Sequence, residues 1–255
     1  MNYLSSLGVM PVIFMCMAGF LAAFVDSIAG GGGIVSVPAY MMLGLPQANV
    51  IGTNKFSATC GSLTSSIKFI KSKKADFKVL KFTIPFVIIG CSIGVKAALL
   101  ISNDSFKTIS SILIIIIGIY TFLSKNMGIE DKFTGYKKLN MGMMCFLSCL
   151  IGFYDGFFGP GTGTFFIFAL IKLFGFEFTK AAGTAKLLNF TSNVLSLVLY
   201  AFAGRIIYAL AIPVGIGAII GAKVGTATAL KHGPKFIKPI FIIISFITAI
   251  KMFIG

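Results

Sequence analysis

The tetrapeptides GTNK at residues 52–55 and GTAK at residues 183–186 each place a lysine, Lys55 or Lys186, inside a long apolar run. An ammonium group at the centre of a bilayer costs roughly 2.5 to 3.5 kcal/mol, even on the scale derived from insertion by the translocon. Two such lysines at matched positions indicate that each has a partner or a task.

The composition is that of an integral membrane protein. Of the 255 residues, 57% are hydrophobic and 11% are charged, and the mean hydropathy is +0.98, outside the range of soluble domains. The net charge of +15 does not indicate nucleic-acid binding, because the lysines lie mainly between apolar segments, as in the cytoplasmic loops of membrane proteins. The cysteines form no CxxC pair, and no residues have metal-ligand spacing, so neither a metal nor a cofactor is expected.

Apolar segments follow one another along the whole chain. About 20 apolar residues are needed to span the bilayer as a helix. We predict ten segments, at residues 7–28, 34–44, 47–69, 77–101, 106–123, 137–158, 163–175, 179–203, 207–230 and 236–254. The second and seventh are too short to cross comfortably. The sequence therefore predicts an all-α membrane protein with broken or short helices at these two places.

The second half of the chain repeats landmarks of the first in the same order. GFLAAFVDSIAGGGG (residues 19–33) corresponds to GFYDGFFGPGTG (residues 152–163), and each contains an aspartate before a glycine cluster. GTNK and GTAK follow, and then IPFVIIGCSIGVK (residues 84–96) corresponds to IPVGIGAIIGAK (residues 212–223). We predict two repeats of five segments, with residues 1–124 as the first, 125–136 as a cytoplasmic linker and 137–255 as the second.

Unequal loops predict that the two repeats are inverted relative to each other. The loop between the third and fourth segments contains six lysines, whereas its counterpart between the eighth and ninth contains only Arg205. Basic residues gather on the cytoplasmic side. If the first loop lies inside, fifteen basic residues face the cytoplasm, and Lys107, Arg205 and Lys251 face outward. An odd number of segments in each repeat requires the same inversion.

Inverted repeats with matching interruptions are typical of secondary transporters, whose substrate site lies near the midplane between the repeats. A glycine cluster can interrupt a helix, and the free N–H groups at the start of the next half-helix favour an anion. Lysines, hydroxyls and amides beside the clusters would complete such a site. The predicted substrate-binding residues are Lys55, Lys186, Gly31, Gly32, Gly33, Thr53, Asn54, Gly161, Thr162, Gly163, Thr184 and Asn189.

Asp26 and Asp155 are the candidate partners of these lysines, since the duplication places one aspartate and one lysine in each half. They either hold the lysines or carry a coupling proton. Three interpretations of the lysines stay open: a structural ion pair, contact with an anionic substrate, or snorkelling towards the interface. Lys96 and Lys223, each after a GxxxG spacing, are second-rank candidates, and the GxxxG glycines are expected to form close-packing surfaces.

The sequence does not indicate an enzyme. GCSIG at residues 90–94 matches the pattern GxSxG, but it lies inside an apolar segment instead of at a strand-to-helix turn. The single histidine, His232, lies in a predicted loop far along the chain. The glycine clusters lack the GKS or GKT of a phosphate-binding loop.

Longer stretches resemble a known family. VDSIAGGGGIVSVPAYMMLGLP with GTNK, and GFYDGFFGPGTGTFF with GTAKLLNFTSNV, resemble the TauE/SafE (TSUP) family of sulfite exporters over nearly the whole chain. The resemblance implies a multi-pass permease of the cell (cytoplasmic) membrane that moves a sulfur-containing anion such as sulfite, thiosulfate or an organosulfonate. The alternative is a membrane structural or assembly protein whose repeated glycines serve helix packing alone.

Overall fold

The computed structural model of the protein describes residues 9–102, 109, 131–133 and 135–254, with side chains up to Lys231. Within these ranges every regular element is a helix, and the predicted all-α class is confirmed. The helices are α2 (Val9–Ala29), α3 (Gly33–Met41), α4 (Gln47–Lys71), α5 (Phe77–Leu100), α7 (Lys138–Phe157), α8 (Thr162–Phe174), α9 (Phe178–Phe202) and α10 (Tyr208–Ile254). The predicted segment 106–123 and most of the predicted linker 125–136 lie outside the described residues.

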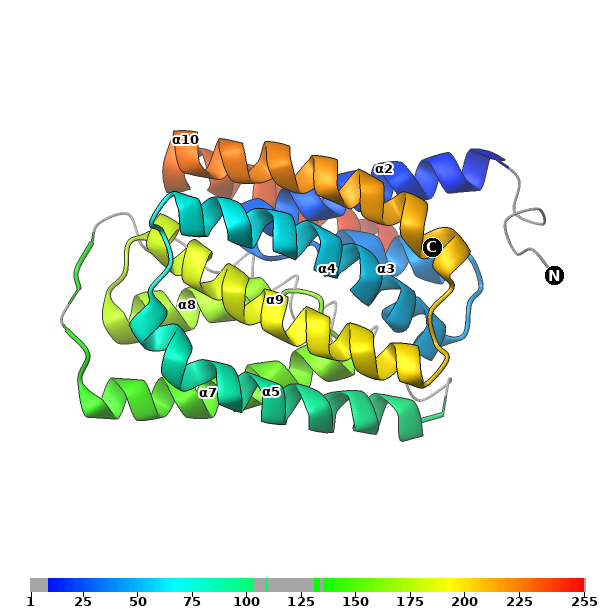
Figure 1. The fold of residues 1–255 in the computed structure, drawn as a ribbon. Coiled ribbons are helices and arrows are strands. Elements are labelled where there is room, and N and C mark those ends of the chain that lie inside the picture. Colours follow the sequence, from blue (N-terminus) through cyan, green and yellow to red (C-terminus); the bar gives the residue numbers. More distant parts are fainter. Residues whose placement is uncertain (1–8, 103–108, 110–130, 134, 255) are drawn as a thin grey trace.

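The two short segments are short helices. α3 has 9 residues and α8 has 13, so they rise about 14 and 20 Å, less than the roughly 30 Å of a hydrocarbon core. The predicted segments 207–230 and 236–254 both fall within α10. In Figure 1 the C-terminus lies at the same end of the molecule as the start of α10, so the helical residues of α10 run to the opposite end of the molecule and then return.

Five helical stretches of the described chain are long and apolar enough to cross a membrane: Met10–Ala29, Phe77–Leu100, Lys138–Phe157, Phe178–Phe202 and Tyr208–Lys231. α4 has 25 residues, as many as α9, but it carries Asn54, Lys55, four serines and three threonines. These polar residues lower its hydropathy. Most are buried inside the protein, which indicates that the polar side of α4 faces other helices and a polar interior.

The helices form a layered arrangement (Figure 1). α2 packs on α10 at one side, α5 packs on α7 at the other, and α4 and α9 pack on each other in the middle. Each outer pair combines a helix from one predicted repeat with a helix from the other. The two halves are therefore interlocked instead of lying side by side as separate units.

Glycines of the GxxxG spacings lie where the outer pairs touch. A Cβ atom on Gly94 of α5 would lie 2.0 Å from the carbonyl oxygen of Phe153 in α7, and one on Gly221 of α10 would lie 2.1 Å from that of Phe20 in α2. Real Cβ atoms do not come this close, so only glycine permits these contacts. The expected close-packing role of these glycines is confirmed, with equivalent contacts on the two sides.

Candidate functional site

A small cavity lies among α2, α3, α4, α7 and α9, beside the two glycine clusters. Its volume is about 40 Å³, which on the usual scale holds about three water molecules. Both halves of the chain line it. Its polar side chains are Asp26, Ser36, Asn54, Lys55, Ser57, Asp155, Asn189 and Asn193, and its glycines include Gly30, Gly32, Gly33 and Gly159.

Lys55 reaches this cavity from α4. Its side chain is buried, with 1% of the residue exposed. Its Nζ lies 3.0 Å from Oδ2 of Asp155 and donates a hydrogen bond of 3.1 Å to Oδ1 of Asn193. Asp155 is equally buried and also accepts a short hydrogen bond from the Ser192 hydroxyl. The Lys55 ammonium therefore has one charged and one neutral partner at the cavity wall.

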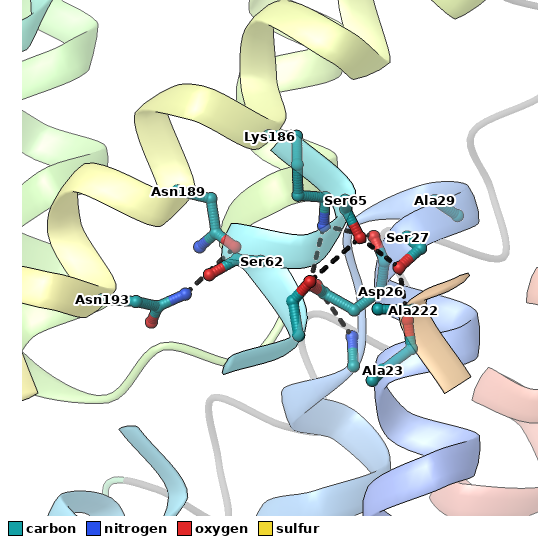
Figure 2. A network of polar contacts seen from close by, with 12 residues as sticks. Ala23, Asp26, Ser27, Ala29, Ser62, Ser65, Lys186, Asn189, Asn193 and Ala222 are labelled. Carbon is teal, nitrogen blue, oxygen red and sulfur yellow. Dashed lines mark hydrogen bonds and ion pairs between the residues drawn. The ribbon is translucent and has the colours of Figure 1, made fainter. Parts of the chain in front are cut away.

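Lys186 of α9 is buried beside the cavity but does not line it. Its Nζ lies 2.6 Å from Oδ2 of Asp26 and 2.5 Å from the carbonyl oxygen of the same residue. Figure 2 shows this pair next to the hydrogen-bonded hydroxyls of Ser27 and Ser65, which lie 2.6 Å apart. Lys186 lines a second, separate pocket with essentially no free volume. Its ammonium is occupied by two oxygens of one residue.

Both ion pairs cross between the halves. Asp26 of α2 pairs with Lys186 of α9, and Asp155 of α7 pairs with Lys55 of α4. The two aspartates are thus the lysine partners that the sequence suggested, but the expectation that each half pairs its own aspartate and lysine was wrong. The reason is the central contact of α4 with α9, across which each lysine reaches the opposite half.

The two glycine clusters touch. A Cβ on Gly30 would lie 2.4 Å from the carbonyl carbon of Gly163, and one on Gly163 would lie 2.5 Å from Cα of Gly30. Gly30 also has φ +79°, a conformation that side chains with a Cβ rarely adopt. The hydroxyl of Thr164 donates to the Ala29 carbonyl at 2.8 Å. The clusters thus join the starts of α3 and α8 across the two halves.

The remaining predicted glycine-cluster residues serve these helix starts. Gly32 and Gly33 line the cavity, and the amide of Gly32 donates to Oδ1 of Asp26 at 3.4 Å. Gly31 accepts from Ile34 within the first turn of α3. Gly161 is the residue before α8, and the Thr162 hydroxyl bonds to the Gly159 carbonyl at 2.7 Å.

Thr53 and Thr184 have partners away from the cavity. The Thr53 hydroxyl accepts a hydrogen bond of 3.1 Å from the amide of Ile207, just before α10. The Thr184 hydroxyl accepts one of 3.0 Å from the amide of Asp76, just before α5. Each threonine therefore holds the start of a helix in the other half.

The glycines beside these threonines explain the rest of the GT dipeptide. A Cβ on Gly52 would lie 2.5 Å from the carbonyl oxygen of Arg205, and one on Gly183 would lie 2.0 Å from that of Lys74. In each case the glycine lets α4 or α9 approach the loop that its neighbouring threonine holds. GT is an anchoring dipeptide, and the lysine two residues later turns to the interior.

The loop that Thr184 holds has an ionic anchor as well. Oδ2 of Asp76 accepts from the Tyr136 hydroxyl at 2.7 Å and lies 3.0 Å from Nζ of Lys180, and Oδ1 accepts from the Val79 amide at 3.0 Å. Burial by itself would raise the pKa of Asp76, but these three partners hold it below the ordinary carboxyl value. Its structural counterpart at the start of α10, Ile207, has no side-chain acceptor.

Four further predicted residues divide between the cavity and the surface. Asn54 and Asn189 line the cavity, whereas Lys96 and Lys223 are exposed. Asn193, a polar neighbour of Lys186 in the sequence that is not among the predicted substrate-binding residues, lies one helical turn after Asn189, accepts from Lys55 and donates to Asn189 at 3.2 Å. Its helical spacing from Asn189 is the signal that could have identified it. Among the described residues no cluster of side chains could hold a metal ion.

Comparisons with known sequences show which family the chain is similar to. The family model described as "Sulfite exporter TauE/SafE" matches residues 15–252. A "Probable membrane transporter protein" of Haemophilus influenzae is 37% identical, over 94% of this chain and 93% of the relative. The "Probable membrane transporter protein YfcA" of Escherichia coli K12 is 37% identical, over 91% and 86% respectively. No solved structure matches the chain.

Proposed function

Because the chain belongs to the TauE/SafE family of membrane transporters, we propose that it carries a small sulfur-containing anion, such as sulfite, thiosulfate or an organosulfonate, through the cavity at Lys55. The protein is a multi-pass protein of the cell membrane, as its five apolar helices and its relatives indicate. The family description, which names sulfite export, supports the choice of substrate class.

The observation that carries the proposal is a buried ammonium at a polar cavity. Lys55 is the one lysine that lines the cavity in the described chain, and Asn54, Asn189 and Asn193 surround it with amide groups. Amide N–H groups and an ammonium donate charge-assisted hydrogen bonds to oxyanions. The small size of the cavity, about 40 Å³, favours a small inorganic anion over a larger organosulfonate.

Asp155 makes anion binding depend on charge. The carboxylate already neutralises Lys55 at 3.0 Å, so an anion entering the cavity must compete with it and would be repelled by it. A proton on Asp155 removes both effects and leaves Lys55 free for the anion. We therefore propose that Asp155 takes up a proton when the anion binds.

Access from the two sides follows from the two repeats. We propose that residues 1–124 and 137–255 are inverted repeats that move against each other around the cavity. Equivalent contacts support this: Gly52 with Thr53 and Gly183 with Thr184 hold the opposite halves in matching ways.

Counterflow in proteoliposomes tests the proposal. Vesicles loaded with unlabelled thiosulfate, sulfite or taurine should accumulate the labelled anion when the wild-type protein is present, and Lys55→Met should abolish this accumulation at equal reconstituted protein. Lys96→Met is the matched control, because Lys96 is exposed and away from the cavity. A protein with a purely structural role would give no counterflow with any of the anions, and that result would refute the proposal.

A further inference from the structure

A groove opens between α5 and α7 on the surface of the part of the chain that the structure describes. Its volume is about 680 Å³, far larger than that of the central cavity. The apolar part is lined by Phe82, Phe86, Met141, Cys145, Phe146 and Cys149. Lys78, Tyr136 and Lys138 line its other end, so the groove is apolar along its length and basic at one mouth.

The packing of the two helices explains why the groove exists. α5 and α7 start at the same end of the molecule (Figure 1). Further along, Gly90 and Gly94 of α5 bring it into backbone contact with α7, where a Cβ on Gly90 would lie 1.9 Å from the Cys149 carbonyl oxygen. Nearer the start, large side chains such as Phe82 and Phe146 replace the glycines. The pair therefore touches at one end and leaves space at the other.

The α2–α10 pair has the equivalent close contacts. Gly217, Gly221 and Gly225 of α10 all lie against backbone carbonyl oxygens of α2, at 2.6, 2.1 and 2.4 Å from the Cβ that each would carry. Close contact thus continues over three successive turns. Gly217 and Gly221 correspond to Gly90 and Gly94, and Gly225 extends the contact at the end away from the start of α10.

We propose that this groove binds one anionic phospholipid of the cytoplasmic leaflet, with its phosphate at Lys78 and Lys138 and an acyl chain along the apolar wall. Basic pockets between transmembrane helices on the cytoplasmic side bind anionic headgroups. The proposal rests on the predicted topology, which places the starts of α5 and α7 inside. It does not depend on the identity of the transported anion.

Length and charge both fit such a lipid. The wall from Lys138 to Cys149 covers eleven helical steps, about 17 Å, which compares with roughly 15 Å for half a hydrocarbon core. Lys78 and Lys138 are exposed, and in the described part of the chain neither forms an ion pair with a carboxylate. Lys78 Nζ instead lies 4.2 Å from the centre of the Tyr136 ring. The N-terminus of α7, which has no side-chain cap, adds the positive end of a helix dipole, whereas that of α5 is already capped by the Asp76 carboxylate.

Gly142 offers a way to close the groove without disturbing the fold. It lies in α7 and lines the groove, and a Cβ there would meet no atom within 4 Å. Gly142→Leu should therefore place a side chain where the acyl chain lies. Because leucine is a better helix former than glycine, the variant should be at least as thermally stable as the wild type in detergent.

The experiment is native mass spectrometry of protein exchanged from nanodiscs of equal parts phosphatidylglycerol and phosphatidylcholine. The wild type should retain one phosphatidylglycerol in preference to phosphatidylcholine. Lys78→Gln combined with Lys138→Gln should lower that preference by about thirtyfold, roughly fivefold for each lysine. Gly142→Leu should remove retention of both lipids. Lys71→Gln, an exposed lysine at the end of α4, is the matched control and should behave as the wild type does.

Two results would overturn the proposal. One is equal retention of the two lipids by the wild type, or retention that Gly142→Leu leaves unchanged. The other is an efficient disulfide between Cys145 and a cysteine introduced within residues 110–124, because the groove would then hold a segment of the chain itself.

Discussion

The two lysine sites begin with nearly the same sequence and differ in what the lysine contacts. Lys55 lines the cavity and shares its ammonium between Asp155 and the amide of Asn193. Lys186 lies behind the cavity wall, and both of its contacts are oxygens of Asp26. The duplicated motif has thus kept its fold-anchoring part in both halves, while only one of its lysines faces an open polar space.

The positions of the aspartates account for this difference. Asp155 follows Gly152 by three residues, whereas Asp26 follows the corresponding Gly19 by seven. Four residues are about one helical turn, so Asp26 lies one turn further along α2 than Asp155 does along α7. There it accepts a hydrogen bond from the Gly32 amide at the start of α3, and Lys186 forms its ion pair with Asp26 at the same place.

The largest expected effect is an all-or-none difference between the loops of the two halves. Ser72 and Ala203 are the residues directly after α4 and α9, and both are exposed. If the repeats are inverted, a cysteine at Ser72 should react in intact cells only with membrane-permeant thiol reagents, and a cysteine at Ala203 should react with impermeant ones. The native cysteines give the background. Labelling of both positions from the same side would refute the inversion.

Replacing both residues of each ion pair together should show that the two lysine sites contribute differently to anion binding. Lys55→Met combined with Asp155→Asn removes both charges at the cavity, and Lys186→Met combined with Asp26→Asn does the same behind it. The first double variant should bind the anion roughly ten- to a hundredfold more weakly, since it loses a charged hydrogen bond of about 1.5 to 3 kcal/mol. The second should change affinity severalfold at most.

Stability in detergent provides the control for these variants. Lys55→Met leaves the buried Asp155 carboxylate unpaired, which costs about 3 to 5 kcal/mol. Lys186→Met should cost less, because Asp26 is only partly buried, and each double variant should recover most of its loss. Equal loss of anion affinity in the two double variants would contradict the assignment of substrate contact to Lys55 alone.

The third effect concerns pH and is smaller. If a proton on Asp155 frees Lys55 for the anion, wild-type transport should rise as the pH falls. Asp155→Asn is permanently uncharged, so its transport should vary less over the same range. Thiosulfate is the suitable substrate, because its charge does not change there. A well-folded Asp155→Asn protein that follows the wild-type pH profile would exclude Asp155 as the proton carrier.

The sequence predicted the elements well because hydropathy and glycine clusters are local signals. Every predicted segment within the described residues corresponds to helix, and the short ones are α3 and α8. It also identified both lysines and both aspartates. It could not predict that the pairs exchange between the halves, because that depends on the contact between α4 and α9, which are more than a hundred residues apart.

The sequence could not predict the roles of the GT dipeptides either. A hydroxyl next to a buried lysine is a reasonable anion ligand from the sequence, but Thr53 and Thr184 bind backbone amides of loops that follow other helices. These loops have no sequence motif in common, since one ends in Asp76 and the other in Ile207. Only the folded arrangement brings equivalent amides to equivalent hydroxyls.

The smallest expected effect tests this last equivalence. Thr53 and Thr184 are fully buried, with 0% exposed, and valine has almost the same shape as threonine but no hydroxyl. Thr184→Val should leave the buried Asp76 amide without an acceptor, at a cost of about 1 to 3 kcal/mol, and should lower the melting temperature. Thr53→Val should lower it less, because the Ile207 amide is only partly buried. The comparison belongs at neutral pH, where Asp76 is ionised in both states: in the folded protein its pKa is lowered, and in the unfolded chain its ordinary carboxyl pKa is also well below neutral. The contribution of the Asp76 carboxylate to the free energy of unfolding would be lost only in acid, as the pH falls from the ordinary carboxyl pKa through the lower pKa of the folded protein.

Anion affinity should stay at the wild-type value in both variants, because neither hydroxyl lines the cavity. A loss of affinity with unchanged stability in either variant would instead make that threonine a substrate ligand, as the sequence alone suggested.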